Sequence, residues 1–138
     1  MKLAAALITV AAIAGQGVAA NAAVTIGNAE HGAVLFKQCA ACHRIGPHAQ
    51  NNVGPVLTGV VGRRAATYPG YSYSSAMKRS GIVWNDAELD KFLHAPRKLV
   101  PGTKMGFLGF KRNQDVADVV AYLKMFGPVR SKTATRSK

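Results

Sequence analysis

The sequence predicts a small all-α domain. Apolar residues recur at the three-to-four-residue spacing of an amphipathic helix in the segments 28–39, 85–95 and 113–126. Polar residues suited to helix capping stand at the start of each segment, and no stretch alternates apolar and polar residues as a half-buried strand does. With 138 residues, the chain is long enough for one domain and too short for two.

The first predicted helix begins at Asn28, which is a good N-cap, and runs into Cys39. Glu30 stands in the first turn, where the helix dipole favours an acidic side chain. One face of this helix carries residues at helical spacing that can pack against another element, namely Gly32, Leu35 and Phe36.

The segment 44–70 is predicted to be a long loop, because Gly and Pro interrupt any periodic pattern. A loop of this length is expected where a chain wraps around a prosthetic group. A short helix follows, which is capped by Ser72 or Ser74 and stops at Gly81.

Two further helices complete the prediction. The first starts with a capping-box pair, Asn85 and Glu88, with Trp84 and Leu89 at hydrophobic-staple positions, and it ends before Pro96. The last helix is expected to be capped by Asn113, with Asp115 in its first turn, and to end at Gly127-Pro128. Its apolar stripe comprises Val116, Val119, Val120, Leu123 and Phe126.

The most specific motif is Cys39-Ala40-Ala41-Cys42-His43. Cys-x-x-Cys-His is the attachment sequence of a c-type haem, in which two thioethers fix the porphyrin and the histidine reaches the iron. These are the only cysteines of the chain, so it forms neither a disulfide framework nor a four-thiolate zinc site. A thioredoxin-like dithiol is disfavoured, because that motif lies between a strand and a helix in an α/β pattern.

Iron ligation by His43 requires an acceptor for the second ring nitrogen, so that the ring keeps its orientation. A backbone carbonyl near Gly54-Pro55 is a candidate for that acceptor. The three other histidines, His31, His48 and His94, are interpreted as ordinary surface residues.

A methionine is the expected ligand on the opposite face, since a His/Met pair gives a relatively high-potential haem suited to carrying electrons. The candidates are Met77, Met105 and Met125. Met77 and Met125 fall on predicted helices, where packing is the simpler interpretation. Met105 lies in an extended segment after Pro101-Gly102, which can present a thioether without helical constraint. We therefore favour Met105.

The N-terminus has the pattern of a secretory signal: a charged start at Lys2, an apolar run over 3–14 and a small-residue segment over 15–22. We predict cleavage after Ala22, with a competing site after Ala20 and an uncleaved membrane anchor as the alternative. The predicted organisation is a signal peptide at 1–22, a domain at 23–127 and a basic, disordered tail at 128–138. Export indicates a periplasmic location.

The formal net charge is +12. A chain this basic suits an acidic protein, an anionic membrane surface or nucleic acid, and export disfavours nucleic acid. Cations cluster in sequence around the segment that holds Met105, which favours docking to an acidic redox partner over a merely solvated surface. We expect at most transient membrane-surface contact and a monomer. The predicted docking cations are Lys37, Arg97, Lys98, Lys104, Lys111 and Arg112.

Taken together, these residues resemble a class I cytochrome c, close to the mitochondrial and small photosynthetic-bacterial carriers. The resemblance covers about residues 27–126. It rests on ordered blocks, which are Gly32 to Phe36, the CAACH motif, Gly54-Pro55, Gly62-Arg63, Pro69 to Tyr73, Trp84, Pro101 to Met105, and Ala121-Tyr122-Leu123.

The resemblance implies roles for individual residues. Cys39 and Cys42 would form the thioethers, and His43 and Met105 would be the axial ligands. The Pro55 carbonyl would accept from His43. The haem propionates would be held by Arg63, Tyr73, Trp84 and Thr103. Gly32 and Phe36 match the crossing of the first helix with the last, near Tyr122, and Phe107 matches the aromatic residue beside the exposed haem edge.

Two positions depart from the family pattern. The family often has a tyrosine near the methionine sulfur, where this chain has Phe92, and a buried asparagine on the short middle helix, where it has Met77. Both departures remove polar groups from the methionine side of the haem.

The resemblance implies an electron carrier, not an enzyme, that transfers single electrons through one covalent haem c. The expected partners are acidic redox proteins: quinol–cytochrome c reductase, a terminal oxidase or a photosynthetic reaction centre. Two alternatives remain. A peroxidase-like enzyme or gas sensor would need an open sixth position at the iron, and a dedicated cytochrome would serve one dehydrogenase.

Overall fold

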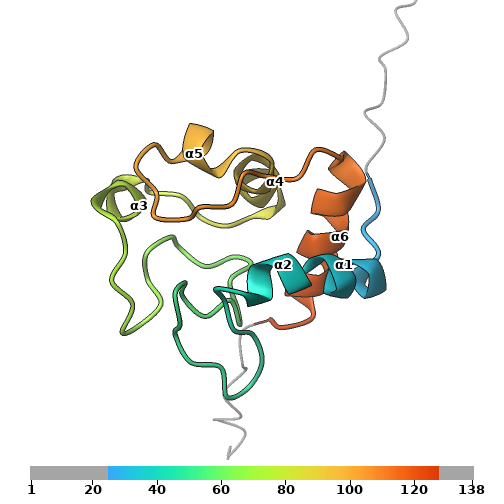
Figure 1. Ribbon diagram of the computed structural model, residues 1–138, viewed down its shortest axis with the longest axis horizontal. Helices are drawn as coiled ribbons and strands as arrows, with labels where there is room; N and C mark the ends of the chain where they lie inside the picture. The colour runs from blue at the N-terminus through green and yellow to red at the C-terminus, as the bar shows by residue number, and fades with distance from the viewer. Residues whose placement is uncertain (1–24, 128–138) are drawn as a thin grey trace, which may run out of the picture.

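In the computed structural model, which describes residues 25–127, the first helix crosses the last on one side of the molecule (Figure 1). The first is α1 (Ala29–Leu35) and the last is α6 (Asn113–Lys124). Between them lie α2 (Lys37–Ala40), α3 (Ser75–Arg79), α4 (Asp86–His94) and α5 (Pro96–Leu99). The predicted signal peptide and basic tail lie outside the described residues.

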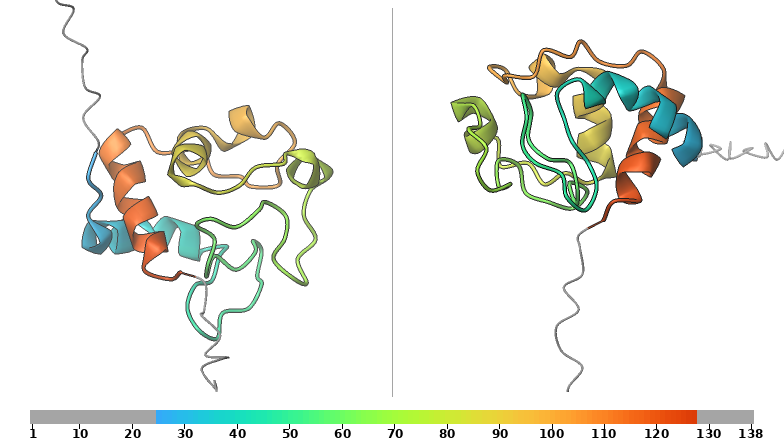
Figure 2. Two further views of the ribbon diagram at one scale, coloured as in Figure 1. Left: turned by 180° about the vertical axis from the view of Figure 1, so that it is seen from behind. Right: turned by 60° about the horizontal axis from the view of Figure 1, so that its bottom comes forward.

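The predicted all-α class and the crossing of the terminal helices are confirmed, as both views in Figure 2 also show. Within residues 25–127 the backbone forms no strand, only one isolated antiparallel bridge between Arg64 and Val83. None of the helices in this part of the chain is long and apolar enough to cross a membrane.

The N-terminal helix begins as predicted. The Asn28 side chain accepts hydrogen bonds from the backbone N–H groups of Glu30 (2.9 Å) and His31 (3.2 Å). The single helix expected over 28–39 is wrong in one respect, because it is divided at Phe36 into α1 and α2. Phe36 is buried and packs on Tyr122 of α6, with ring centroids 5.1 Å apart.

Helix α4 begins at the predicted cap, since the Asn85 side chain accepts from the Glu88 N–H at 2.9 Å. The reciprocal half of the capping box is not formed, because the Glu88 carboxylate pairs with Lys91 at 2.7 Å. Helix α5 was not predicted. It starts at Pro96, a residue compatible with the first position of a helix because that N–H has no intrahelical partner.

Helix α6 buries its apolar stripe as predicted, with Val116 and Val119 each 1% exposed. The predicted cap, Asn113, is wrong by one residue. The N-cap is Arg112, which makes no side-chain capping bond, and the Asn113 side-chain oxygen lies 3.1 Å from His94 Nε2 instead. The predicted stripe extends to Phe126, which follows the end of the helix.

Gly32 lets α1 and α6 approach closely. A Cβ at Gly32 would lie 2.0 Å from the carbonyl oxygen of Asp118, so no larger residue fits without moving a helix. This helix pair forms one wall of the molecule, and the long loop of residues 44–70 and the segment 100–112 extend away from it (Figure 1).

Candidate haem-binding site

A cavity of about 320 Å³ lies between the loops that follow α2, helix α4 and the segment 103–107. This volume is in the range of typical ligand sites, about 300–1,000 Å³. All nine residues predicted to bind haem line this one cavity, although they come from segments far apart in the sequence. They are Cys39, Cys42, His43, Pro55, Arg63, Tyr73, Trp84, Thr103 and Met105.

The two cysteines are positioned by α2 and the turn that follows it. Neither forms a disulfide, and both are partly buried at the cavity wall. Burial, followed by the neighbouring Cys42, raises the pKa of the Cys39 thiol to about 11. Redox-active cysteines instead have a lowered pKa, because the thiolate is the reactive form. The environment of Cys39 therefore disfavours dithiol exchange and is compatible with covalent attachment.

His43 is held by its backbone surroundings. Its Nδ1 lies 2.7 Å from the Pro55 carbonyl oxygen, which can only accept, so Nδ1 carries the proton. Nε2 then keeps its lone pair available for a metal. Burial lowers the pKa of His43, and the bond to Pro55 partly offsets that effect.

Gly54 explains why the ring can lie in this place. A Cβ at Gly54 would come within 2.4 Å of His43 Cε1, so any larger side chain would displace the imidazole. The Gly54 N–H also donates to the Cys42 carbonyl at 2.9 Å, which ties the loop to the end of the attachment motif. The glycine and proline pair thus orients the ring from two sides.

Two methionines line the cavity, Met105 and Met77, whereas Met125 is 68% exposed and lies elsewhere. Met77 is on α3, and Met105 is in the irregular segment after α5. The Met105 N–H donates to Thr103 Oγ1 at 3.2 Å, which fixes the backbone beside the thioether. Sequence reasoning gave Met77 a packing role, and the family resemblance put its position on the methionine side of the haem.

The wall on this side is apolar. Phe92 and Trp84 are both 7% exposed, and their rings pack with centroids 4.8 Å apart. Phe92 and Met77, the two departures from the family pattern, both line the cavity, so its apolar wall is extended at both positions.

Arg63 and Tyr73 bring polar groups to another part of the wall. Arg63 donates to the carbonyl oxygens of Thr58 (2.8 Å) and Val56 (3.0 Å). Burial lowers the pKa of Arg63, against the opposing effects of Tyr73 and Tyr68. Burial likewise raises the pKa of Tyr73. The guanidinium and the phenol are the groups that would face the carboxylates of a bound haem.

Two loops at the mouth of the cavity are joined by hydrogen bonds. Lys104 Nζ donates to the Ser72 carbonyl at 2.8 Å, and the Tyr71 hydroxyl donates to the Val53 carbonyl at 2.8 Å. Asn51 bridges two segments, because its side chain accepts from the Val56 N–H (3.1 Å) and donates to the Pro69 carbonyl (2.9 Å). Sequence reasoning missed Asn51, since a polar residue in a Gly/Pro-rich loop carries no signal of its distant partner.

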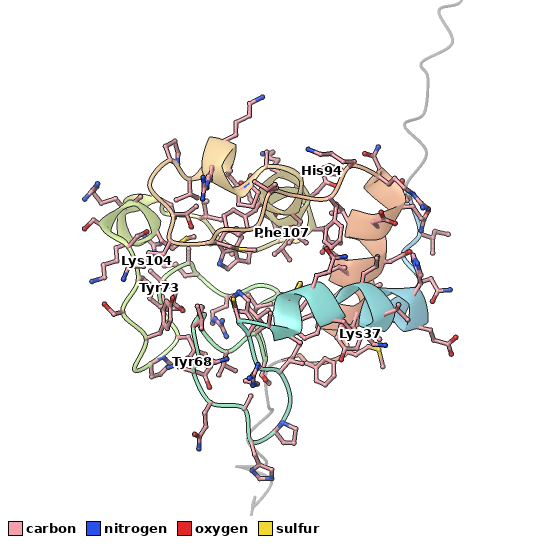
Figure 3. All side chains as sticks on the ribbon, viewed as in Figure 1. Lys37, Tyr68, Tyr73, His94, Lys104 and Phe107 are labelled. Atoms are coloured by element: carbon pink, nitrogen blue, oxygen red, sulfur yellow. The ribbon has the colours of Figure 1, made fainter. Side chains whose placement is uncertain are left out.

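The predicted docking residues fall into two groups. Lys104 and Phe107 line the cavity itself, and Figure 3 shows Lys104 and Lys37 toward opposite sides of the view with Phe107 between them. The other cations are exposed but do not line the cavity. Among them, Arg112 pairs with Asp115 at 3.6 Å.

The residues fit a covalent haem c. Two thiols, an imidazole with its Nδ1 proton engaged, a loop methionine and a guanidinium without an ion pair in residues 25–127 surround one largely apolar cavity. Of the four histidines in the sequence, only His43 lines that cavity in the part of the chain the structure describes.

The comparisons with known proteins agree with this chemistry. The family model for cytochrome c matches residues 29–126. Cytochrome c2 of Rhodomicrobium vannielii is 47% identical over 116 residues, which cover 84% of this chain and 93% of that relative. Cytochrome c-554 of Methylosinus trichosporium is 42% identical over 121 residues, covering 88% and 92%.

A solved structure, cytochrome cH from Methylobacterium extorquens, shares 45% identity and superposes with a TM-score of 0.68, covering 72% of this chain and 99% of its own. The chain belongs to the cytochrome c family, and it is accordingly an electron carrier with one covalently attached haem c and not an enzyme.

Proposed function

We propose that this cytochrome carries single electrons between membrane redox complexes in the periplasm, with its iron held by His43 and Met105. The observation that carries the proposal is that an imidazole fixed by Pro55 and a loop methionine fixed by Thr103 line the same cavity. The predicted signal peptide, cleaved after Ala22, supports export before the haem is attached to the domain at 23–127.

When bound, haem c supplies a one-electron iron couple whose potential depends on the ligands, the burial and the charges around it. The chain's own residues set these conditions. The Pro55 carbonyl holds the Nδ1 proton of His43, so the ring keeps one orientation in both oxidation states. The apolar wall of Trp84 and Phe92 excludes water, and low dielectric disfavours the additional charge of oxidised iron.

Lys104, which lines the cavity, and the exposed cations near it in the sequence support docking to acidic redox partners, for which we propose quinol–cytochrome c reductase, a terminal oxidase or a photosynthetic reaction centre. Complementary charge speeds encounter without requiring tight binding, which suits a carrier that must also leave.

The ligand assignment is tested by comparing two methionine variants of the purified holoprotein. Met105→Leu should abolish the methionine–iron absorption band of the ferric protein, whereas Met77→Leu, which removes the other cavity methionine, should retain it. The opposite result would assign the ligand to Met77. A wild-type protein that is high-spin at rest would contradict ligation by either methionine.

The docking face is tested by the rate at which membranes that contain quinol–cytochrome c reductase reduce the protein. This rate should fall steeply with added salt, because surface charges separated by more than about 10 Å are screened at 0.1 M ionic strength. Lys98→Gln should lower the rate at low salt, and Lys124→Gln, on α6 and paired with Asp86 at 2.5 Å, should leave it unchanged. A rate that does not depend on salt would reject this docking face.

A further inference from the structure

Arg63 is a partly buried cation whose charge has no counter-ion among residues 25–127. No carboxylate in residues 25–127 lies within ion-pair distance of its guanidinium. Two of its N–H groups donate to the carbonyl oxygens of Thr58 and Val56, and those oxygens are neutral. A partly buried guanidinium that has only neutral acceptors is stabilised by a nearby anion. Because Arg63 lines the cavity, the carboxylates of a bound haem would supply that anion.

The Arg63 guanidinium lies over the ring of Tyr68. Arg63 Cζ lies 5.0 Å from the centroid of the Tyr68 ring, within the range of a cation–π contact. Tyr68 does not line the cavity, and its ring contacts the site through Arg63, whereas its backbone is near Tyr73. Figure 3 shows Tyr68 beneath Tyr73, on the same side of the molecule.

We infer that Tyr68 is a positioning residue that holds Arg63 against the haem carboxylates and so contributes to the midpoint potential. The inference rests on the proposed role of Arg63 in the site and names the residue that fixes it. The two carbonyl acceptors anchor the ends of the guanidinium, and the aromatic ring restricts its remaining freedom to tilt and keeps water from one face. Neither the attachment motif nor the methionine loop contains a signal for this contact.

The electrostatic consequence has a definite sign. A cation fixed beside the haem disfavours the more positive, oxidised state and therefore raises the potential. Without the Tyr68 ring, the guanidinium would be more mobile and better hydrated, and its effect would weaken. We therefore expect loss of the ring to lower the potential, which shifts the equilibrium toward the oxidised protein by about threefold, or about 28 mV at 59 mV per tenfold.

The experiment is a double-mutant cycle on the purified holoprotein, read by redox titration. Tyr68→Leu should lower the midpoint potential, and Tyr68→Phe, which keeps the ring, should leave it near the wild-type value. In the Arg63→Gln background, Tyr68→Leu should have no further effect. If Arg63→Gln does not yield holoprotein, Arg63→Met takes its place, because methionine is an unbranched side chain without a charge and so makes no cation–π contact with the ring.

A second measurement reports the contact without using the iron. The rate at which phenylglyoxal modifies Arg63, mapped by mass spectrometry in the folded holoprotein, should rise about threefold in Tyr68→Leu and stay unchanged in Tyr68→Phe. An unchanged rate in Tyr68→Leu would overturn the inference.

The remaining outcomes distinguish a failure of the role inferred for Tyr68 from a failure of the role proposed for Arg63. Equal shifts of the potential in both backgrounds, or no shift in either, would overturn the role of Tyr68, because the residue would then act independently of Arg63 or not at all. A potential left unchanged by Arg63→Gln itself would instead overturn the role of Arg63, even where the modification rate still reports the stacking.

Discussion

The crossing of α1 and α6 and the wall around the cavity are built in opposite ways. At the crossing, the chain satisfies its own polar groups. Asp118 is 2% exposed and accepts hydrogen bonds from the Asn28 N–H (2.7 Å) and Gln114 Nε2 (2.7 Å), with His31 Nδ1 at 2.6 Å from its second oxygen. At the cavity, the residues line a shared space. Within residues 25–127, Arg63 has no carboxylate partner and the Nε2 atom of His43 has no hydrogen-bond partner.

The two regions have different roles in the protein. The helix pair is a self-contained frame, because close backbone contact and a fully bonded carboxylate depend only on the chain. The cavity wall is largely apolar and comes mainly from loops. We therefore expect its structure to depend on the bound haem more than the structure of the helix pair does. An electron carrier benefits from this arrangement, since a rigid frame keeps the ligands in place while the iron changes charge.

The largest expected effect is at the frame. Gly32→Val should lower the free energy of unfolding by about 3 kcal/mol, because its side chain would meet the Asp118 carbonyl and force the helices apart. Urea titration of the holoprotein measures the change. Gly127→Val is the matched control and should cost little, since among residues 25–127 a Cβ there would meet only the Lys124 carbonyl oxygen, at 3.8 Å. Equal effects would mean that the crossing does not limit stability.

The second effect concerns the buried carboxylate. Asp118→Asn should cost about 2 kcal/mol at neutral pH, because hydrogen bonds to a charged group are lost. The exposed Asp86→Asn, which removes a surface pair with Lys124, should cost less than about 1 kcal/mol. A larger loss at Asp86 would contradict the view that the frame depends on its buried carboxylate.

The pH dependence of stability tests the same group. Burial alone raises the pKa of Asp118, but hydrogen bonds from Asn28, His31 and Gln114 outweigh burial and hold the pKa below its usual value. Because the folded pKa is the lower one, the carboxylate stabilises the protein above about pH 4, and this contribution is lost as the pH falls further. The free energy of unfolding, measured by urea titration at several pH values between 3 and 6, should change less with pH in Asp118→Asn than in the wild type. An identical pH dependence in the two proteins would exclude this role for Asp118.

The smallest effect is at the cavity wall. Phe92→Tyr should raise the midpoint potential by about 40 mV, the equivalent of one hydrogen bond of about 1 kcal/mol, if the new hydroxyl donates to the Met105 sulfur. Donation withdraws electron density from the ligand and disfavours oxidised iron. Phe107→Tyr is the control, because Phe107 is partly exposed and its hydroxyl would reach water. A redox titration with no shift in Phe92→Tyr would mean that this position does not tune the iron.

The chemistry of the site could be predicted from local patterns. The attachment motif names two thiols and a histidine within five residues, and the N-caps Asn28, Ser74 and Asn85 all appear in the structure where the sequence indicated them. The capping error at Asn113 has a physical reason. That side chain lies within hydrogen-bond distance of His94, a partner on another helix that local reasoning does not include.

By itself, the sequence determined the main helices, though not α5 or the break at Phe36, together with the haem attachment and the set of candidate ligands, because each depends on residues close together in the chain. Only the tertiary structure decided which distant groups meet: Asp118 with the start of α1, Asn51 with Pro69, and Tyr68 with Arg63. The reason is that these contacts depend on the path of irregular loops. A loop has no periodicity, so its sequence does not indicate which residue will lie opposite it.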